Sequence, residues 1–266
     1  MSGKNLGPAI IERSEYIKLV LSEHLHQPDT YSNLTKEAAL TQLDSMKQLA
    51  SELYCEHATN LDEHSIDYFR HFLLKIPTNL RIPQFYGMAK VHKMKVPTPM
   101  RPVISQCGSF TTYISTWLDT MLQPFTKYLP TYLKNSNDLL GIIDKLPPLP
   151  LTARIVTTDA VSMYTNISTQ EGIATLREYL NKYAAEYNSQ FPTTLVCDLI
   201  EIVMNNNIFE FGDTWWQQQN DTAMGTPCAC IYATLFFGFH KRNLLLQKYK
   251  NNIILFKRQI DDIFLI

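Results

Sequence analysis

The sequence has 266 residues, of which 45% are hydrophobic, 18% are charged and 9 are glycine. This composition excludes a disordered chain and predicts a globular protein with one sizeable core or two lobes. The 5 cysteines form no CxxC pair and no Cys/His spacing of the zinc type, so neither a disulfide framework nor a structural zinc is indicated. The N-terminal residues lack a signal-peptide core, and the longest apolar run is too short to cross a bilayer. We therefore expect a soluble intracellular protein with no membrane partner.

The net charge of −1 hides two long segments that contain no acidic residue, Tyr68 to Leu118 and Thr222 to Ile260. Their basic residues are Arg70, Lys75, Arg81, Lys90, Lys93, Lys95, Arg101, Lys241, Arg242, Lys248, Lys250, Lys257 and Arg258. Any single one of them is more often a solvated surface charge than a ligand-binding group. Two acid-free segments together favour a surface that faces a polyanion.

The first part of the chain, to about Phe72, alternates charged and apolar residues at helical spacing. We expect helices there, joined by a loop at residues 26–35. From residue 76 repeated prolines exclude long helices, and residues 84–93 and 100–105 are predicted to form two extended segments around a turn. This hairpin would carry basic residues. A helix is expected around residues 110–128.

The linker "KLPPLP" ends this region, and "ARIVTTDA" predicts a strand that delivers Asp159 to its C-terminal edge. Helices are expected at residues 169–187 and 193–205. Gly225 and Pro227 in "TAMGTP" predict a turn that opens a helix running to Tyr249. Residues 252–266 are apolar on both sides of an acidic pair, which predicts a β-hairpin with carboxylates at its tip.

The two carboxylate sites, Asp159 and the pair Asp261 and Asp262, are far apart in the sequence, so only the tertiary fold could unite them. Mg²⁺ binds oxygen ligands, usually one or two protein carboxylates together with phosphates and water. Converging Asp159 and Asp261 would suit such an ion. Each acid by itself is more simply explained as part of a hairpin turn or as a helix cap.

Five blocks, in this order, resemble the polymerase motifs of reverse transcriptases, most closely those of Penelope-like retroelements. They are "FYGMAKVHK", "RPVIS", "TTDAVSMYTNI", "TAMGTPCACIYATLFFG" and "RQIDDIF". The resemblance implies an α+β fold of right-hand polymerase fingers and palm, with a ferredoxin-like palm sheet packed with helices. It implies an N-terminal helical region at 1–75 leading into fingers, fingers with the basic hairpin at 76–150, and a palm at 151–266. The palm is expected to be incomplete and the thumb missing.

The resemblance also implies RNA-directed DNA polymerase activity. Two Mg²⁺ ions, or Mn²⁺ in their place, would assist attack of a primer 3′-hydroxyl on the α-phosphate of a deoxynucleoside triphosphate. The implied partners are an RNA template, a DNA primer and the dNTP. The implied location is the nucleus.

Asp159, Asp261 and Asp262 correspond to the catalytic acids of the family. The resemblance makes Asp159 and Asp261 the shared metal ligands, with the main-chain carbonyl of Ala160 as a further ligand. Asp262 would support the site, so its loss should be less damaging. Tyr164 corresponds to a steric gate against a ribose 2′-hydroxyl, although a core tyrosine is an equally good explanation from the sequence alone.

Arg101 corresponds to the fingers arginine that grips the triphosphate, a role that suits its planar donor fork. Of Lys90 and Lys93, one would contact phosphate, and we favour Lys93. Gly225 would let the backbone approach the templating pair or the nucleotide. Gln218 would be the glutamine upstream of that glycine, although Gln217 to Gln219 leave the register open.

Three positions depart from the family pattern. Gln259 replaces an aromatic residue near the primer end, Asp221 replaces a glycine and Cys230 replaces a proline. Together with the missing thumb, Gln259 favours the alternative of a catalytically inactive, truncated nucleic-acid-binding remnant. The retained acids and Arg101 oppose it. A nucleotide cyclase, another two-metal enzyme with a palm, would not explain the basic hairpin or Tyr164.

Overall fold

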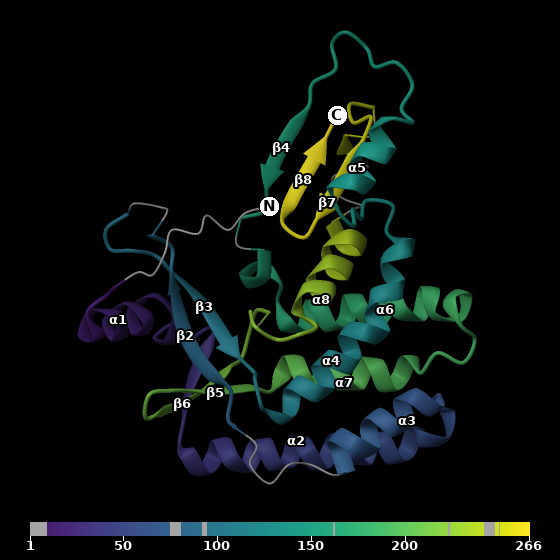
Figure 1. Cartoon of the computed structure of the whole chain (residues 1–266). Helices are drawn as coiled ribbons and strands as arrows, with labels where there is room; N and C mark the ends of the chain where they lie inside the picture. Colours follow the sequence, from purple (N-terminus) through teal and green to yellow (C-terminus); the bar gives the residue numbers. More distant parts are fainter. Residues whose placement is uncertain are drawn as a thin grey trace.

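The structure of the chain, a computed structural model, describes residues 10–74, 81–91, 95–161, 163–222, 224–241, 248–249 and 251–266. Helices and two separate β-sheets make up these parts, so the protein is α+β, as expected. In Figure 1 a three-stranded sheet stands above a body of helices, and a five-stranded sheet lies beside that body.

The α-helices are α1 (Arg13–Val20), α2 (Lys36–His57), α3 (Glu63–Phe69), α4 (Phe110–Leu122), α5 (Ser136–Ile143), α6 (Thr169–Tyr187), α7 (Thr193–Asn205) and α8 (Ala229–Phe236). The strands are β1 (Tyr31–Leu34), β2 (Gln84–Ala89), β3 (Met100–Ser105), β4 (Val156–Asp159), β5 (Asn207–Phe211), β6 (Thr214–Gln218), β7 (Phe256–Gln259) and β8 (Asp262–Leu265). Short 3₁₀ and π-helical turns are η1 (Leu21–Leu25), η2 (Ala58–Asn60), η3 (Arg70–Leu74), η5 (Gln123–Tyr128), η6 (Met163–Asn166) and η7 (Phe237–Lys241).

The five-stranded sheet has the order β1-β6-β5-β2-β3 and draws strands from all three sequence ranges that were predicted as separate regions. The predicted hairpin is confirmed as the antiparallel pair β2 and β3. The loop predicted at residues 26–35 is wrong in part, because β1 pairs there with β6. Tyr31 explains this: it is buried, and its ring makes edge contacts with Phe85 and Phe209. Tertiary packing thus outweighs the local preference for a loop.

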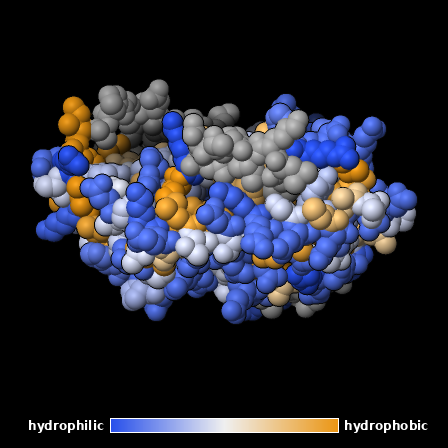
Figure 2. All heavy atoms as spheres, turned by 90° about the horizontal axis from the view of Figure 1, so that it is seen from below, coloured by the Kyte–Doolittle hydropathy of each residue, from blue (hydrophilic) through white to orange (hydrophobic). Residues whose placement is uncertain are grey.

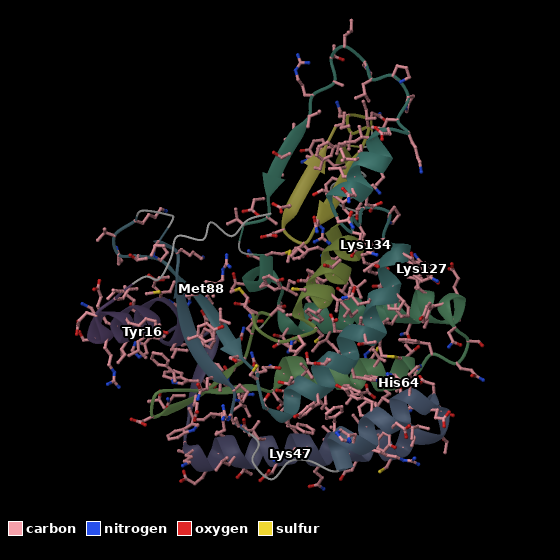
Figure 3. The ribbon with its side chains drawn as sticks, in the orientation of Figure 1. Tyr16, Lys47, His64, Met88, Lys127 and Lys134 are labelled. Carbon is pink, nitrogen blue, oxygen red and sulfur yellow. The ribbon has the colours of Figure 1, made fainter. Side chains whose placement is uncertain are left out.

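Helix α1 closes one face of this sheet over a small core. The core contains Val20, Leu25, Tyr31, Phe85, Ile104, Phe209 and Trp216. Tyr16, labelled on α1 in Figure 3, accepts a hydrogen bond at its hydroxyl from the main-chain N–H of Gly87, 2.8 Å away. The N-terminal helix is therefore tied directly to the backbone of the hairpin.

The main core lies among the helices. Helices α4, α6, α7 and α8 bury apolar faces against one another, with α2 and α3 packed on α4 and α7. Tyr179 and Tyr232 are among its largest fully buried side chains. The predicted helices at 169–187 and 193–205 are confirmed with those bounds. Because their apolar residues recur at helical spacing, the sequence pattern and the packing agree.

The side of the molecule that carries α2 and α3 is mainly hydrophilic, with hydrophobic side chains in scattered groups (Figure 2). Exposed apolar residues on α2 include Leu40 and Leu49. Within the described ranges, no helix has the length and apolar character needed to span a membrane.

The three-stranded sheet has the order β4-β8-β7 and is antiparallel throughout. It confirms the predicted strand before Asp159 and the predicted hairpin around the acidic pair. Strand β4 lies at one edge, and all its residues are exposed. At the other edge, the main chain of Arg258 exchanges hydrogen bonds with Leu133 N–H (2.9 Å) and Thr131 carbonyl (2.8 Å). Helix α5, which the sequence analysis did not predict, lies beside this sheet in Figure 1.

Helix α8 covers the first part of the helix predicted to run to Tyr249. It continues as the π-helical turn η7, and residues 242–247, through which the predicted helix would run, lie outside the described parts. Gly225, in the turn before α8, has a positive φ of 109°, and the neighbouring Met224 carbonyl accepts a hydrogen bond from Ile104 N–H at 2.8 Å. The turn is therefore seated against the backbone of β3.

Replacing Gly225 with alanine should destabilise the protein by about 3 kcal/mol, because a Cβ there would clash with the Ile104 carbonyl oxygen and the backbone conformation disfavours L-residues. Gly141→Ala on α5 is the matched control, because its Cβ meets nothing within 4 Å. That substitution should be neutral or stabilising by about 0.5 kcal/mol. Urea unfolding measures both, and equal free energies of unfolding for the two variants would contradict the prediction.

Asp221, whose φ is 71°, occupies a left-handed position that aspartate tolerates better than most residues. Burial raises the pKa of its carboxyl to about 6. The folded state therefore binds a proton more tightly than the unfolded state, whose aspartate pKa is about 3.9. The protonated Asp221 carboxyl therefore contributes stability that is fully present below about pH 4 and is lost as the pH rises towards 6.

Asp221→Asn should therefore raise the free energy of unfolding at pH 7 by about 1 kcal/mol, a value discounted for partial solvent exposure, and should change it little at pH 4. Asp213→Asn, which removes an exposed charge from the turn between β5 and β6, is the control. Urea unfolding from pH 4 to 7 measures the difference. A stability gain for Asp221→Asn that is the same at both pH values would contradict the assignment.

Candidate active site

Three carboxylates meet where β4 ends and β8 begins. The strand register places Asp159 directly opposite Asp262, and Asp261 occupies the turn between β7 and β8. One carboxylate oxygen from each lies within 4.8 Å of the others, and all three residues are exposed. The Ala160 N–H donates a 2.8 Å hydrogen bond to the main-chain carbonyl of Asp261. The backbone itself therefore holds the two acid-bearing segments together, and the acids converge as the sequence analysis required.

This arrangement carries an electrostatic cost. Like charges directly opposite each other across two strands destabilise a sheet. A cation among the three carboxylates would remove that repulsion, and an all-oxygen donor set fits a hard divalent ion such as Mg²⁺. The residues present thus fit the implied metal, with Asp159 and Asp261 as the expected ligands. The metal roles of Asp262 and of the Ala160 carbonyl stay predictions.

The turn that carries Asp261 has an unusual backbone. Gln259 pairs with Asp262, so Ile260 and Asp261 form a two-residue connection, and Ile260 has a φ of +54°. A β-branched side chain at positive φ costs about 1–3 kcal/mol and persists only where its surroundings hold it. Such strain is typical of functional sites.

Arg258, on β7, corrects the expectation that both acid-free segments form a polyanion-facing surface. It is only 7% exposed, and its guanidinium donates to main-chain carbonyls inside the protein. Burial lowers the pKa of Arg258 to about 10, although the nearby Asp261 opposes this shift. This inward orientation was not predicted from the sequence. Strand β7 reads FKRQ and contains a single apolar residue, so its sequence carries no signal of a buried arginine.

Tyr164 lies in η6, a few residues after Asp159. Burial raises the pKa of its phenol, and the nearby Cys230 and Asp261 raise it further, whereas Arg101 opposes them. The pKa of Tyr164 is therefore affected both by the acid cluster, through Asp261, and by the exposed Arg101 of β3. Its hydroxyl lies 3.2 Å from the Cys230 sulfur at the start of α8. This contact was not predicted from the sequence, in which Cys230 stood out only as a departure from the family pattern.

Arg101 and Lys90 lie on the hairpin of β2 and β3. Arg101 is exposed and pairs in register with Met88, which Figure 3 labels on β2. Lys90 follows β2, and its main-chain N–H donates to the Pro99 carbonyl at 2.8 Å. Its charge also adds to burial in lowering the pKa of His24. Lys93, the lysine favoured as a phosphate contact, lies outside the described residues.

Gln218 and Gly225 have structural partners. Gln218 is buried in β6, where its side-chain oxygen accepts from Asn207 Nδ2 and its Nε2 donates to the Asn220 carbonyl, each at 2.9 Å. Gly225 packs against the Ile104 carbonyl of β3. The predicted close backbone approach is thus made to the protein itself, and a contact of either residue with nucleotide stays a prediction.

The acid-bearing ends of β4 and β8 point towards the body of the protein (Figure 1). On that side lie the hairpin of β2 and β3, which carries Arg101, and the first turn of α8, which carries Cys230. The arrangement could bind a divalent cation at the acids and an anionic ligand between the acids and the hairpin.

No known family model matches the sequence, and no curated protein matches it. Among solved structures, one similar chain is telomerase from Candida albicans in complex with a TWJ fragment of telomeric RNA. The TM-score is 0.46 and the sequence identity 13%, over 82% of this chain and 42% of that chain. The chain thus spans less than half of that telomerase, and a likeness at this level shows no family.

Proposed function

We propose that the chain provides the fingers and palm of an RNA-directed DNA polymerase, a reverse transcriptase of the Penelope-like retroelement kind. The observation that carries the proposal is the convergence of Asp159, Asp261 and Asp262, whose carboxylate oxygens lie within 4.8 Å of one another. By resemblance, the ordered sequence motifs match these acids to the positions that hold the metals in such enzymes. In this proposal the substrates are a deoxynucleoside triphosphate and a DNA primer paired with an RNA template.

In this proposal the acids bind the metal ions and orient them, and the bound ions would supply the chemistry. Two Mg²⁺ ions, when bound there, would supply electrostatic stabilisation of the attacking and leaving oxygens of an in-line displacement at the α-phosphate. Asp159, at the end of β4, and Asp261, in the turn before β8, would hold the ions. Asp262, paired with Asp159 across the sheet, would add negative charge that favours cation binding. Mn²⁺ accepts the same oxygen ligands.

The nucleotide lies, in this proposal, between the acids and the hairpin. Arg101 is exposed on β3 and donates to triphosphate oxygens, with Lys90 or Lys93 as a second cation. In this proposal Tyr164, whose pKa is affected by both Asp261 and Arg101, contacts the sugar of the nucleotide. A ribose 2′-hydroxyl would meet its ring.

A second candidate is a nucleic-acid-binding protein without turnover. One observation favours it: Gln259 replaces the aromatic residue near the primer end, and its amide donates to the Lys134 carbonyl at 3.2 Å. Lys134 is labelled near the three-stranded sheet in Figure 3. That side chain is engaged with its own chain and presents no ring to a primer.

Primer extension on a poly(rA) template with an oligo(dT) primer and Mg²⁺ separates the two candidates. The polymerase proposal expects extension by the wild-type chain. Asp261→Asn should lower the rate by about 1000-fold, because it removes one anionic metal ligand without changing shape. Asp262→Asn should lower it by a smaller factor, about 10- to 100-fold, as expected for a supporting group.

Two results would contradict the polymerase proposal. Primer extension by the Asp261→Asn variant at the wild-type rate would show that Asp261 is not a required metal ligand. No extension by the wild type, together with salt-sensitive binding of the same duplex, would favour the binding protein, because such binding depends on phosphate contacts alone.

Tyr164→Val should reduce discrimination against ribonucleoside triphosphates by about 100-fold, because the smaller side chain leaves room for the 2′-hydroxyl. Tyr164→Phe is the control, since it removes the hydroxyl that contacts Cys230 but keeps the ring. The ratio of kcat/KM for dTTP and UTP measures discrimination. If both variants discriminate as the wild type does, Tyr164 is a core residue and not a gate.

A further inference from the structure

Arg258 is a buried cation beside the acid cluster, and no role in the proposed reaction accounts for it. It lies on β7, three positions before Asp261, and is 7% exposed. Within the described residues no carboxylate oxygen lies within 4.0 Å of its guanidinium nitrogens. A buried charge is costly unless hydrogen bonds compensate it. Its partners therefore indicate what it does.

The guanidinium joins the acid-bearing turn to the helical core. Nη1 donates to the Ile260 carbonyl and Nη2 donates to the Thr234 carbonyl of α8, each at 2.7 Å. Nη1 also lies 3.8 Å from the Met163 sulfur in η6, next to Tyr164. The guanidinium carbon stands 5.7 Å from the centre of the Phe237 ring. One planar donor fork thus reaches the turn, α8 and the segment that follows Asp159.

The turn needs such an anchor. Ile260 holds a positive φ that β-branched residues disfavour, and it directly precedes Asp261. If the turn relaxed, the Asp261 backbone would rotate, and its main-chain hydrogen bond from Ala160 N–H would weaken. Both the carboxylate of Asp261 and the link to β4 therefore depend on the conformation of Ile260.

We propose that Arg258 is a positioning residue that holds the strained turn at Ile260 and so aims the Asp261 carboxylate at the metal. The consequence for metal binding rests on the function proposed above. Arg258 touches neither metal nor substrate and acts through the Ile260 carbonyl. Lysine in its place keeps the charge but cannot donate to two carbonyls in the geometry of a planar fork.

An electrostatic role and a positioning role of Arg258 predict opposite effects of its substitution on cation binding. A positive charge beside the acids repels a metal ion, so a purely electrostatic role means that Arg258→Met tightens cation binding and Arg258→Lys leaves it unchanged. A positioning role means that both substitutions weaken binding. Lys257→Met is the matched control, because Lys257 is the neighbouring cation on β7 and its Nζ donates to the Pro130 carbonyl, away from the turn.

The experiment measures Mn²⁺ affinity of the full chain by electron paramagnetic resonance for wild type, Arg258→Lys, Arg258→Met and Lys257→Met. Hydrogen exchange of the Ala160 amide is followed in the same samples, well below each melting temperature. We expect Arg258→Lys to weaken Mn²⁺ binding about 10-fold and to speed exchange of the Ala160 amide. Arg258→Met should do so at least as strongly, and Lys257→Met should leave both readouts unchanged.

Wild-type affinity and wild-type amide exchange in Arg258→Lys would overturn the proposal, even if its melting temperature falls, because a merely structural role moves stability alone. Tighter binding by Arg258→Met would overturn it in favour of a charge effect. A wild-type chain that binds no Mn²⁺ would defeat the proposed function instead. In that case unchanged Ala160 exchange in Arg258→Lys overturns the positioning role, and faster exchange supports it.

Discussion

The antiparallel register between β4 and β8 is the constraint on which the acid cluster depends. It sets Asp159 opposite Asp262 and brings Asp261 to the adjacent turn. Because side chains alternate between the faces of a sheet, a slip of one residue would send Asp159 and Asp262 to opposite sides. The repulsion within the cluster works against this pairing, so the rest of the sheet must hold it. The pairing is stabilised by the short strand β7, by its main-chain contacts with residues 131–133 and by the buried Arg258.

The helical core and the five-stranded sheet position the three-stranded sheet that carries the acids. Helix α8 links them: its Thr234 carbonyl binds Arg258, and Cys230 near its start contacts Tyr164. The turn before α8 is seated on β3 through Gly225 and Met224. Strand β3 in turn carries Arg101. Acids, tyrosine and arginine are therefore positioned through one chain of packed backbone segments, although they come from distant parts of the sequence.

Local patterns in the sequence predicted much of the fold. Helices α6 and α7, the hairpin of β2 and β3, and the acid-tipped hairpin follow from periodicity and turn residues, and the structure confirms them. Strand β1 was missed because its pairing with β6 is a tertiary contact, and α5 is too short for periodicity to reveal. The convergence of Asp159 with Asp261 was expected only by resemblance. The burial of Arg258 could not be predicted from charge counting, which treats every cation as exposed.

The most direct test of the account is a crystal of the chain soaked in Mn²⁺, whose anomalous scattering locates the ion. The account predicts an ion within about 2.3 Å of carboxylate oxygens of both Asp159 and Asp261. An ion bound elsewhere, with these two carboxylates left without one, would contradict the claim that the register of β4 and β8 builds a metal site.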